Sequence, residues 1–490
     1  MRNEELLQML SCMGSQGRAE RESGEHLRKS FYAVPEQIRA LDPDVTLILG
    51  NRGAGKTSLF RAISEFDLIE SFKQQYPKSR IPDNALWVSV KMDWVPVDLV
   101  GKSVPPQEQL VSFFENQNLN DMEAFAFWES ILVRNLWEYM DAQGQKDCKA
   151  VHDASGSTVS DLLSAFNTIQ LLSSAALDRL DDRLEKEGKA LFIGYDDLDL
   201  LVRNTGKGVS SLMGFWATRS RRWKGIRAKL FMRTDLYTRF GFGGGPDLAK
   251  IAANQITLKW SDQSLLGMLV KRIINSGDIQ LIKKSFHISA NELIGNDDTG
   301  WSLKHETPDK LSEIITILLG VYMGAGPKKG ATQRWIINHI KDCKDNAVPR
   351  FLVRLIESAA QKQLQSRNDF TTIISPIFIR EALSEISIEH VKASEPEWPW
   401  LPGLIQKISR IPQVQIIPFE KKVFENEIKK SWNESWGQNN IPPPCEDYRD
   451  FLPLLAEFGI MRERFDGRYE TTDLYLDGLG FKRKGGVKRR

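Results

Sequence analysis

Residues 45–57 read VTLILGNRGAGKT, an apolar run that breaks into glycines and ends on a lysine and a threonine. Gly50, Gly55, Lys56 and Thr57 fill the spacing GxxxxGK[ST], which is typical of a phosphate-binding loop between a strand and a helix. Glycines let the backbone wrap closely around a phosphate, so that successive amide N–H groups and the start of the following helix can point at it. The stretch therefore predicts a buried strand, a phosphate-binding loop and a helix, in that order.

Each part of this loop has an expected task. We expect Lys56 to reach the β and γ phosphates of a nucleotide, and the Thr57 hydroxyl to bind Mg²⁺. A glycine-rich turn with a surface lysine is the alternative, but the apolar strand before the loop and the helical pattern after it favour phosphate binding. The motif predicts as nucleotide-binding residues Gly50, Asn51, Arg52, Gly53, Ala54, Gly55, Lys56, Thr57 and Ser58.

The length and composition of the chain limit the class of protein that carries this motif. A chain of 490 residues is too long for one hydrophobic core, and a formal net charge of +2 indicates no particular partner. The four cysteines lie far apart without a CxxC pair, which predicts free thiols and a reducing compartment. The start of the sequence lacks the apolar core of a signal peptide, and no apolar run approaches 18 residues. We therefore expect a cytoplasmic protein with no membrane segment.

A second apolar run, ALFIGYDDLD over residues 190–199, ends in carboxylates. A magnesium nucleotide site needs one carboxylate for the metal and a second that orients the attacking water. We assign Asp196 to the metal and Asp197 to the water, and we expect Asp199 to brace the loop. A metal-free acidic turn is the alternative, which the upstream phosphate loop disfavours.

Further strands complete a predicted sheet. Residues 85–90, 228–235 and 255–260 are apolar and rich in strand-forming side chains. The last of these runs leads into a helix over residues 262–274, with Ser261 or Asp262 as its N-cap.

The ordered set LILGNRGAGKT, LFIGYDDLDLL and KLFMRTDLY resembles the ASCE division of P-loop ATPases. It is most similar to the AAA-like and STAND-like bacterial members, which carry DD rather than DE after the acidic strand. The resemblance covers roughly residues 30–360 and implies an α/β fold with a parallel P-loop NTPase sheet and a helical lid. It also implies ATP and Mg²⁺ as cofactors and a γ-phosphate sensor at Arg233 or Thr234, with Arg233 taken as catalytic beside Lys56 and Asp197. A surface pair of Arg233 with Asp235 is the alternative.

The same resemblance also has implications for the lid and for the rate of ATP hydrolysis. It places Arg350, near the start of a helix that begins at residue 349, as a second sensor of the γ phosphate. Aspartate at position 197, where AAA proteins usually have glutamate, leaves slow, switch-like hydrolysis as open as motor-like turnover. The sequence lacks an NKxD-like guanine-reading motif, which together with the resemblance favours ATP.

A basic run follows the acidic strand at Arg219, Arg221, Arg222 and Lys224. Three interpretations stay open: an arginine finger given to a neighbouring subunit, a patch for nucleic-acid phosphates, or a solvated basic face. The first would require a homo-oligomer.

Near the C-terminus, a short amphipathic helix over residues 448–459 precedes two short strands joined by Asp466-Gly467, which is a hairpin-turn signal. This order resembles the end of a winged-helix domain. Six cations occupy the last nine residues, which suits nucleic-acid binding or a disordered solubilising tail.

These patterns predict four parts: an N-terminal helical segment (1–40), a P-loop ATPase core (41–262), a helical lid (263–395) and a winged-helix-like α+β domain with a basic tail (396–490). The six histidines are scattered, and no nuclease, protease or deaminase constellation is present. The sequence thus predicts a nucleotide-dependent ATPase switch or assembly scaffold, such as an anti-phage defence or regulatory component with a separate effector protein. The alternative is a DNA-associated ATPase, such as a loader, a repair protein or a transposition regulator.

Overall fold

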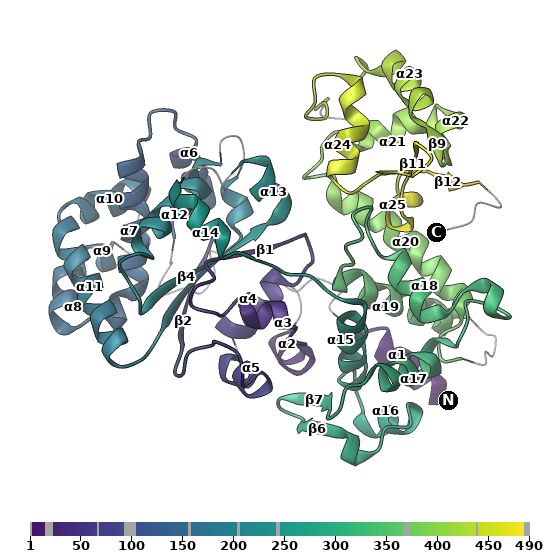
Figure 1. The fold of residues 1–490 in the computed structure, drawn as a ribbon, viewed down its shortest axis with the longest axis horizontal. Helices are drawn as coiled ribbons and strands as arrows, with labels where there is room; N and C mark the ends of the chain where they lie inside the picture. Colours follow the sequence, from purple (N-terminus) through teal and green to yellow (C-terminus); the bar gives the residue numbers. More distant parts are fainter. Residues whose placement is uncertain are drawn as a thin grey trace. The chain divides into compact units, whose positions relative to one another are not determined.

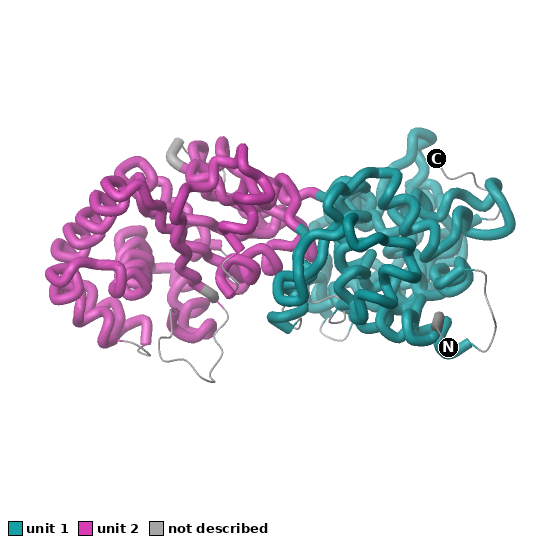
Figure 2. The backbone as a smooth tube through the Cα atoms, turned by 90° about the horizontal axis from the view of Figure 1, so that it is seen from below, with its two compact units in different colours: residues 1–32, 260–490 teal, residues 33–259 magenta. Residues whose placement is uncertain are grey.

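The computed structural model describes residues 2–14, 23–65, 68–92, 104–154, 158–202, 206–241, 246–366, 372–437 and 440–484. The chain divides into two compact units (Figure 2). Unit 1 consists of Met1–Tyr32 and Trp260–Arg490, and unit 2 consists of Ala33–Lys259. The phosphate-loop sequence lies in unit 2, whereas unit 1 is mostly helical.

Unit 2 is built on a five-stranded parallel sheet (Figure 1). Its strands are β1 (Leu47–Gly50), β2 (Leu86–Lys91), β3 (Leu191–Asp196), β4 (Ile226–Arg233) and β5 (Ile256–Thr257), in the spatial order β2-β3-β4-β1-β5. The additional strand β4 therefore lies between the loop strand β1 and the acidic strand β3. This confirms the P-loop NTPase sheet of ASCE type that the sequence predicts.

The register of the strands brings the predicted site residues to one edge of the sheet. Gly50, the last residue of β1, lies opposite Arg233, the last residue of β4. Strand β3 ends at Asp196 and also runs parallel to β4. Because parallel strands end at the same edge, the phosphate loop and the polar ends of β3 and β4 share that edge.

One face of the sheet packs against helix α4 (Lys56–Ser64), which follows the loop. The Phe60 ring of α4 meets the rings of Trp87 and Phe231 edge-on, at centroid distances of 5.8 and 5.7 Å. Gly194 on β3 makes room for this cluster, because a Cβ there would lie 2.1 Å from the Trp87 ring. The aromatic packing thus fixes α4, and with it the end of the phosphate loop, on the sheet.

The opposite face carries the helices inserted between β2 and β3 and the helix after β3. Leu49, Ile193 and Leu230 point into this core together with Trp128 and Trp216, and all five are buried. The remaining helices of unit 2 are α3 (Pro35–Arg39), α5 (Ile69–Gln75), α6 (Gln107–Phe114), α7 (Asp121–Leu136), α8 (Ala142–Asp147), α9 (Lys149–Asp153), α10 (Val159–Asn167), α11 (Gln170–Lys186), α12 (Lys207–Arg219), α13 (Thr234–Arg239) and α14 (Pro246–Ala253).

Unit 1 has its own core, to which the N-terminal helix contributes. Helix α1 (Arg2–Leu10) packs against α19 (Pro349–Gln365) and buries Leu6 and Leu10. The structure confirms the helix predicted over residues 262–274. Ser261 is its N-cap, because the Ser261 Oγ accepts a hydrogen bond from the Ser264 amide. The other elements are α2 (Gly24–Ser30), α15 (Asp262–Ile274), α16 (Ile279–Ser285), β6 (Leu293–Asn296), β7 (Gly300–Leu303), α17 (Pro308–Leu319), α18 (Thr332–His339), α20 (Pro376–Ser394), α21 (Leu401–Ser409), α22 (Pro412–Gln415), β8 (Ile416–Ile417), α23 (Lys421–Ser431), α25 (Asp473–Leu476) and β12 (Lys482–Arg483).

The C-terminal part of unit 1 contains the predicted hairpin. Strands β10 (Arg462–Glu463) and β11 (Arg468–Glu470) pair antiparallel, and β9 (Phe419–Glu420) adds a third strand. The turn needs Gly467, whose φ is +78°. Helix α24 (Phe451–Glu457) precedes the hairpin, so the winged-helix-like order predicted from the sequence is present. Residues 485–490 of the basic tail lie outside the described residues.

Within the described ranges, none of the helices combines the length and the apolar character that crossing a bilayer requires.

Candidate functional site

The phosphate loop is a tight turn that depends on glycine at two positions. Gly53 and Gly55 have φ angles of +79° and +95°, which side chains rarely tolerate. A Cβ on Gly50 would lie 3.1 Å from the Ala54 Cβ, and the Ala54 amide donates to the Asn51 carbonyl at 3.0 Å. The loop therefore wraps closely enough for its amides to surround a phosphate.

Lys56 turns its ammonium back over this loop. Its Nζ donates to the carbonyls of Gly50 and Asn51, at 2.8 and 3.2 Å. Burial lowers the pKa of the ammonium to about 8, while the nearby Asp196 carboxylate acts in the opposite direction. A cation that donates to neutral carbonyls keeps its charge available, and an incoming phosphate would pair with it more strongly than the carbonyls do.

Thr57 and Asp196 join the loop to the acidic strand. The Thr57 hydroxyl approaches the carboxyl group of Asp196, which is 3% exposed at the end of β3, closely enough to lower the pKa of that carboxyl. Burial raises the pKa of this carboxyl to about 6, against the opposing effects of the Asp197 amide, Lys56 and Thr57. Two residues that the sequence places 139 positions apart thus meet at one point.

The donor set at this point fits Mg²⁺ bound together with a nucleotide. Mg²⁺ prefers oxygen ligands and is commonly held by one or two protein groups, with phosphate oxygens and water completing the shell. Thr57 and Asp196 supply a hydroxyl and a carboxylate. In the part of the chain that the structure describes, no group of three His, Cys, Asp or Glu side chains could hold a metal ion by itself.

The other two aspartates of the acidic run follow directly. Asp197 is half-buried and adopts a left-handed backbone conformation, with φ +59° and ψ +28°. Asp199 lies in the 3-10 turn Leu198–Leu201 and acts electrostatically on both Lys56 and Asp196. The sequence predicted the position of these carboxylates, but nothing in it indicated the conformation of Asp197.

At the end of β4, Arg233 forms the pair that the sequence analysis gave as the alternative to a sensor. Its Nη2 and Nε donate to the two carboxylate oxygens of Asp235, at 2.7 and 3.1 Å. The Arg233 side chain is 13% exposed and the Asp235 side chain is 38% exposed, so the pair is partly buried. Thr234 Oγ1 is buried and has no hydrogen-bond partner among the described residues. The sensor role of Arg233 stays a prediction, and the Thr234 hydroxyl is the less engaged of the two groups.

Arg350, the predicted second sensor, is the second residue of α19 and belongs to unit 1. The phosphate loop belongs to unit 2. Its role at the γ phosphate therefore stays a prediction.

Three of the four cations in the basic run after β3 pair with carboxylates of the same chain. Arg219 pairs with Glu129, and its guanidinium lies 5.4 and 5.3 Å from the ring centroids of Phe215 and Trp223. Arg222 pairs with a carboxylate as well, that of Asp178 on α11. Lys224 Nζ lies 2.6 Å from Glu185 Oε1. This pairing favours the interpretation as a charged face over an arginine finger.

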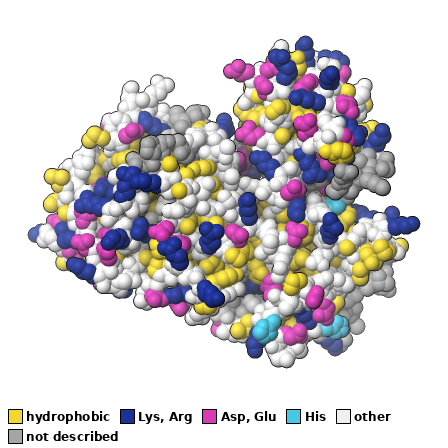
Figure 3. Space-filling view, viewed as in Figure 1, with side chains coloured by type: hydrophobic (Ala, Val, Ile, Leu, Met, Phe, Trp, Pro, Cys, Tyr) yellow, Lys and Arg dark blue, Asp and Glu magenta, His cyan; other side chains and the backbone are white. Residues whose placement is uncertain are grey.

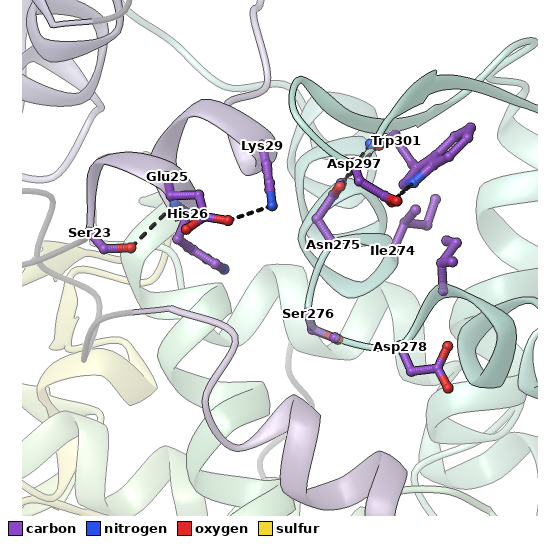
Figure 4. A pocket seen from close by; sticks show the side chains of 12 residues that line it. Ser23, Glu25, His26, Lys29, Ile274, Asn275, Ser276, Asp278, Asp297 and Trp301 are labelled. Carbon is purple, nitrogen blue, oxygen red and sulfur yellow. Dashed lines mark hydrogen bonds and ion pairs between the residues drawn. The ribbon is translucent and has the colours of Figure 1, made fainter.

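A separate cavity of about 530 Å³ lies in unit 1, between α2, the end of α15 and the β6–β7 hairpin (Figure 4). Most of its polar side chains bond to one another or to backbone groups. Lys29 Nζ donates to Glu25 at 2.6 Å, and Trp301 Nε1 donates to Asp297 at 2.9 Å. The Asn275 side chain holds both backbone groups of Trp301. The cavity is therefore a weaker candidate for a ligand site than the loop.

Comparison with known proteins gives distant structural likenesses. No protein-family model matches the chain, and no curated protein matches it. A Walker-type ATPase of Pyrococcus abyssi is similar at a TM-score of 0.41 and 13% identity, covering 92% of this chain and 97% of that chain. The ORC2 protein of Aeropyrum pernix, in ADPNP–ADP complexes, gives 0.39 and 12%, covering 93% and 95%. The Cdc6p protein of Pyrobaculum aerophilum gives 0.32 and 12%, covering 93% and 96%. At these TM-scores the case for an activity depends on the geometry of the site.

Proposed function

We propose that this protein is a P-loop ATPase that binds Mg-ATP at residues 50–58 and hydrolyses it. The approach of the Thr57 hydroxyl to the buried Asp196 carboxyl carries the proposal, because it brings the helix after the loop and the acidic strand together at the point where a magnesium nucleotide needs both. A glycine-rich structural turn would not require a buried carboxylate from another strand beside its lysine.

Each side chain then has a defined task. The loop amides and Lys56 hold the β and γ phosphates, and Thr57 and Asp196 hold Mg²⁺, which when bound neutralises phosphate charge. Asp197 orients the attacking water and accepts its proton. Thr234 or Arg233 contacts the γ phosphate from the end of β4, and Arg350 does so from the lid.

The sequence favours ATP as the nucleotide and a slow rate of hydrolysis. ATP is favoured by the resemblance to ASCE ATPases and by the lack of a guanine-reading motif in the sequence. The aspartate at position 197 is shorter than the usual glutamate, so we propose slow or partner-stimulated turnover. Nucleotide state would then act as a switch.

We further propose that this switch belongs to the AAA-like and STAND-like bacterial type and controls a separate effector, as in an anti-phage defence or regulatory system. A homo-oligomer remains part of the proposal. The pairing of Arg219 and Arg222 with carboxylates of the same chain weakens the argument for a finger acting between subunits.

A DNA-associated ATPase is the second candidate, and the winged-helix-like order of α24, β10 and β11 favours it. The arginines of the hairpin weigh against it, because each is paired with a carboxylate of the same hairpin. Arg462 and Arg464 contact Glu470, and Arg468 contacts Asp466. On the face drawn in Figure 3, basic and acidic side chains are interspersed. Binding of nucleic acid would therefore depend on the exposed side chains of Lys482 and Lys484 and on residues 485–490.

Steady-state hydrolysis assays separate the two candidates. We expect magnesium-dependent release of phosphate from ATP, with GTP a poor substrate. Stimulation by DNA of any sequence that disappears at raised salt would favour the DNA-associated ATPase. Hydrolysis unaffected by DNA would favour the switch with a protein effector, and a wild-type protein that does not bind Mg-ATP would contradict both.

A further inference from the structure

The guanidinium of Arg233 is held at two points by a carboxylate of its own chain. Its Nη2 and Nε donate to the two carboxylate oxygens of Asp235, at 2.7 and 3.1 Å. Arginine binds a phosphate group with the same parallel pair of donors that it offers to a carboxylate. Asp235 therefore occupies the donors with which Arg233 would contact a phosphate.

This ion pair lies beside the phosphate loop. Arg233 is opposite Gly50 in the parallel register of β4 and β1, and neighbouring strands lie about 4.8 Å apart. The Gly50 carbonyl in turn accepts from Lys56 Nζ at 2.8 Å. The charges of Arg233 and Asp235 both act on the Lys56 ammonium. The pair and the proposed phosphate-binding lysine are therefore close enough to share one anionic ligand.

The path of the chain explains why the two residues meet. Strand β4 ends at Arg233, and helix α13 begins with Thr234, so that Asp235 lies in the first turn of this helix. An acidic side chain is favourable in a first turn without any further role, because the helix N-terminus carries a partial positive charge. A stabilising role of this kind is the alternative that an experiment must separate from an effect on the nucleotide.

We propose that Asp235 competes with the γ phosphate for Arg233: it holds the guanidinium when ADP or no nucleotide is bound and releases it to the γ phosphate of ATP. This rests on the proposed function and takes Arg233, and not Thr234, as the residue that contacts the γ phosphate. Asp235 is then a positioning residue that lowers the preference of the site for triphosphate over diphosphate. The exchange of partner also makes the junction between β4 and α13 sensitive to the nucleotide state.

The preference for triphosphate is measured as a ratio of dissociation constants. Calorimetric titrations in excess Mg²⁺ give the constants for ADP and for the non-hydrolysable analogue AMP-PNP, and their ratio isolates the contribution of the γ phosphate. Asp235→Asn keeps the size of the side chain but removes its charge. We expect this variant to raise the preference for AMP-PNP about fivefold, which is the upper range for a partly exposed ion pair.

Arg233→Ala and the double variant Arg233→Ala/Asp235→Asn decide whether the effect passes through the arginine. Arg233→Ala should lower the preference for AMP-PNP below that of the wild-type protein, and adding Asp235→Asn should then change nothing. A rise of the preference in the double variant over Arg233→Ala would overturn the proposal, since it would assign the effect to removal of a negative charge alone.

An unchanged preference in Asp235→Asn would also overturn the proposal, because a first-turn carboxylate that only stabilises α13 alters the melting temperature but not this ratio. Asp235→Ser carries the same expectation and keeps the test valid if the asparagine variant does not fold.

Asp447→Asn is the matched control. Asp447 holds Arg449, also two residues away, with Nε and Nη2 donating to its two carboxylate oxygens at 2.9 and 3.0 Å, but in unit 1. Its preference for AMP-PNP should equal that of the wild-type protein, and a rise as large as in Asp235→Asn would overturn the assignment to Asp235.

Failure of the proposed function gives a different result from failure of this inference. Without a nucleotide site, the wild-type protein would bind neither ADP nor AMP-PNP. If Thr234 and not Arg233 contacts the γ phosphate, the wild-type protein would bind both nucleotides and Arg233→Ala would keep the wild-type preference, which would overturn the role of Asp235 alone.

Discussion

Lys56 and the cations of the basic run, all in unit 2, are held by different kinds of partner. Lys56 donates to the backbone carbonyls of its own loop, at 2.8 and 3.2 Å, with the Asp196 carboxyl nearby. Three of the four cations of the basic run, by contrast, contact carboxylates of neighbouring helices: Arg219 pairs with Glu129, Arg222 with Asp178 and Lys224 with Glu185. A carboxylate partner neutralises a cation, whereas a carbonyl does not. The difference indicates that the loop is arranged to receive an anion and that the basic run stabilises the fold.

The largest expected effect on hydrolysis comes from removing the carboxylate of Asp197, which follows the acidic strand. Asp197→Asn should lower the rate constant of hydrolysis about 100-fold or more, because a positioned general base contributes on that order, with nucleotide affinity changed little. Single-turnover hydrolysis and equilibrium binding measure the two quantities. Asp178→Asn, which removes the partner of Arg222, is the control and should leave the rate unchanged. Wild-type hydrolysis by Asp197→Asn would mean that Asp197 does not act on the water.

The second prediction is a pH dependence that comes from Lys56 in the loop and Asp196 at the end of β3. The protonated form of Lys56 binds phosphate, and bound phosphate raises its pKa, so affinity for Mg-ATP should fall up to about tenfold per unit as the pH rises above about 8. In the proposed site ionised Asp196 would bind Mg²⁺, which would lower the pKa of its carboxyl, so affinity should also fall as the pH drops below about 6. Affinity should therefore be highest between these values.

Calorimetric titrations across this range measure the affinity. Lys56→Ala should abolish the alkaline limb, and Asp196→Asn should leave in the acid limb only the titration of the nucleotide itself. An alkaline limb that survives in Lys56→Ala would assign it to another group.

The third prediction concerns stability. Arg219 and Glu129 have side chains that are 19% and 8% exposed, so Arg219→Ala leaves a nearly buried carboxylate without its cation and should cost about 2 kcal/mol. Arg222 is 57% exposed, and Arg222→Ala should cost less than about 1 kcal/mol. Urea denaturation measures both. Adding Glu129→Gln to Arg219→Ala should recover part of the loss, and no recovery would show that the pair is not the cause.

The smallest expected effect is in a mixing experiment. A Lys56→Ala chain mixed with an Arg221→Ala/Arg222→Ala chain should give no more hydrolysis than the sum of the two alone, because the pairing of Arg222 leaves it engaged within its own subunit. Activity well above that sum would contradict this interpretation. It would establish that the run supplies an arginine to a neighbouring subunit.

Much of unit 2 could be predicted from the sequence because its signals are local. The GxxxxGK[ST] spacing and the two apolar runs that end in polar residues identify β1, β3 and β4. Parallel pairing then places their ends at one edge without further information. Likewise, Asp466-Gly467 identified the C-terminal hairpin, since that turn type needs a positive φ.

The rest depends on contacts between residues far apart in the sequence. The sequence of the basic run is equally compatible with an arginine finger, a nucleic-acid patch and a charged face. The carboxylate partners that distinguish these interpretations lie on α7 and α11, more than 30 residues upstream. The left-handed conformation of Asp197 has no sequence signal, since aspartate occurs in many conformations. Nor does the sequence indicate that helix α1 completes the core of the unit that contains α19.

Isothermal titration of Mg-ATP into the wild-type protein and into Lys56→Ala tests the central claim most directly. Removal of a charged donor from a buried site costs about 3 kcal/mol, so we expect saturable binding by the wild-type protein and at least about 100-fold weaker binding by the variant. Lys224→Ala, which removes a cation paired with Glu185, should bind like the wild type. Equal affinity of Lys56→Ala and wild-type protein for Mg-ATP would contradict the assignment of residues 50–58 as the phosphate site.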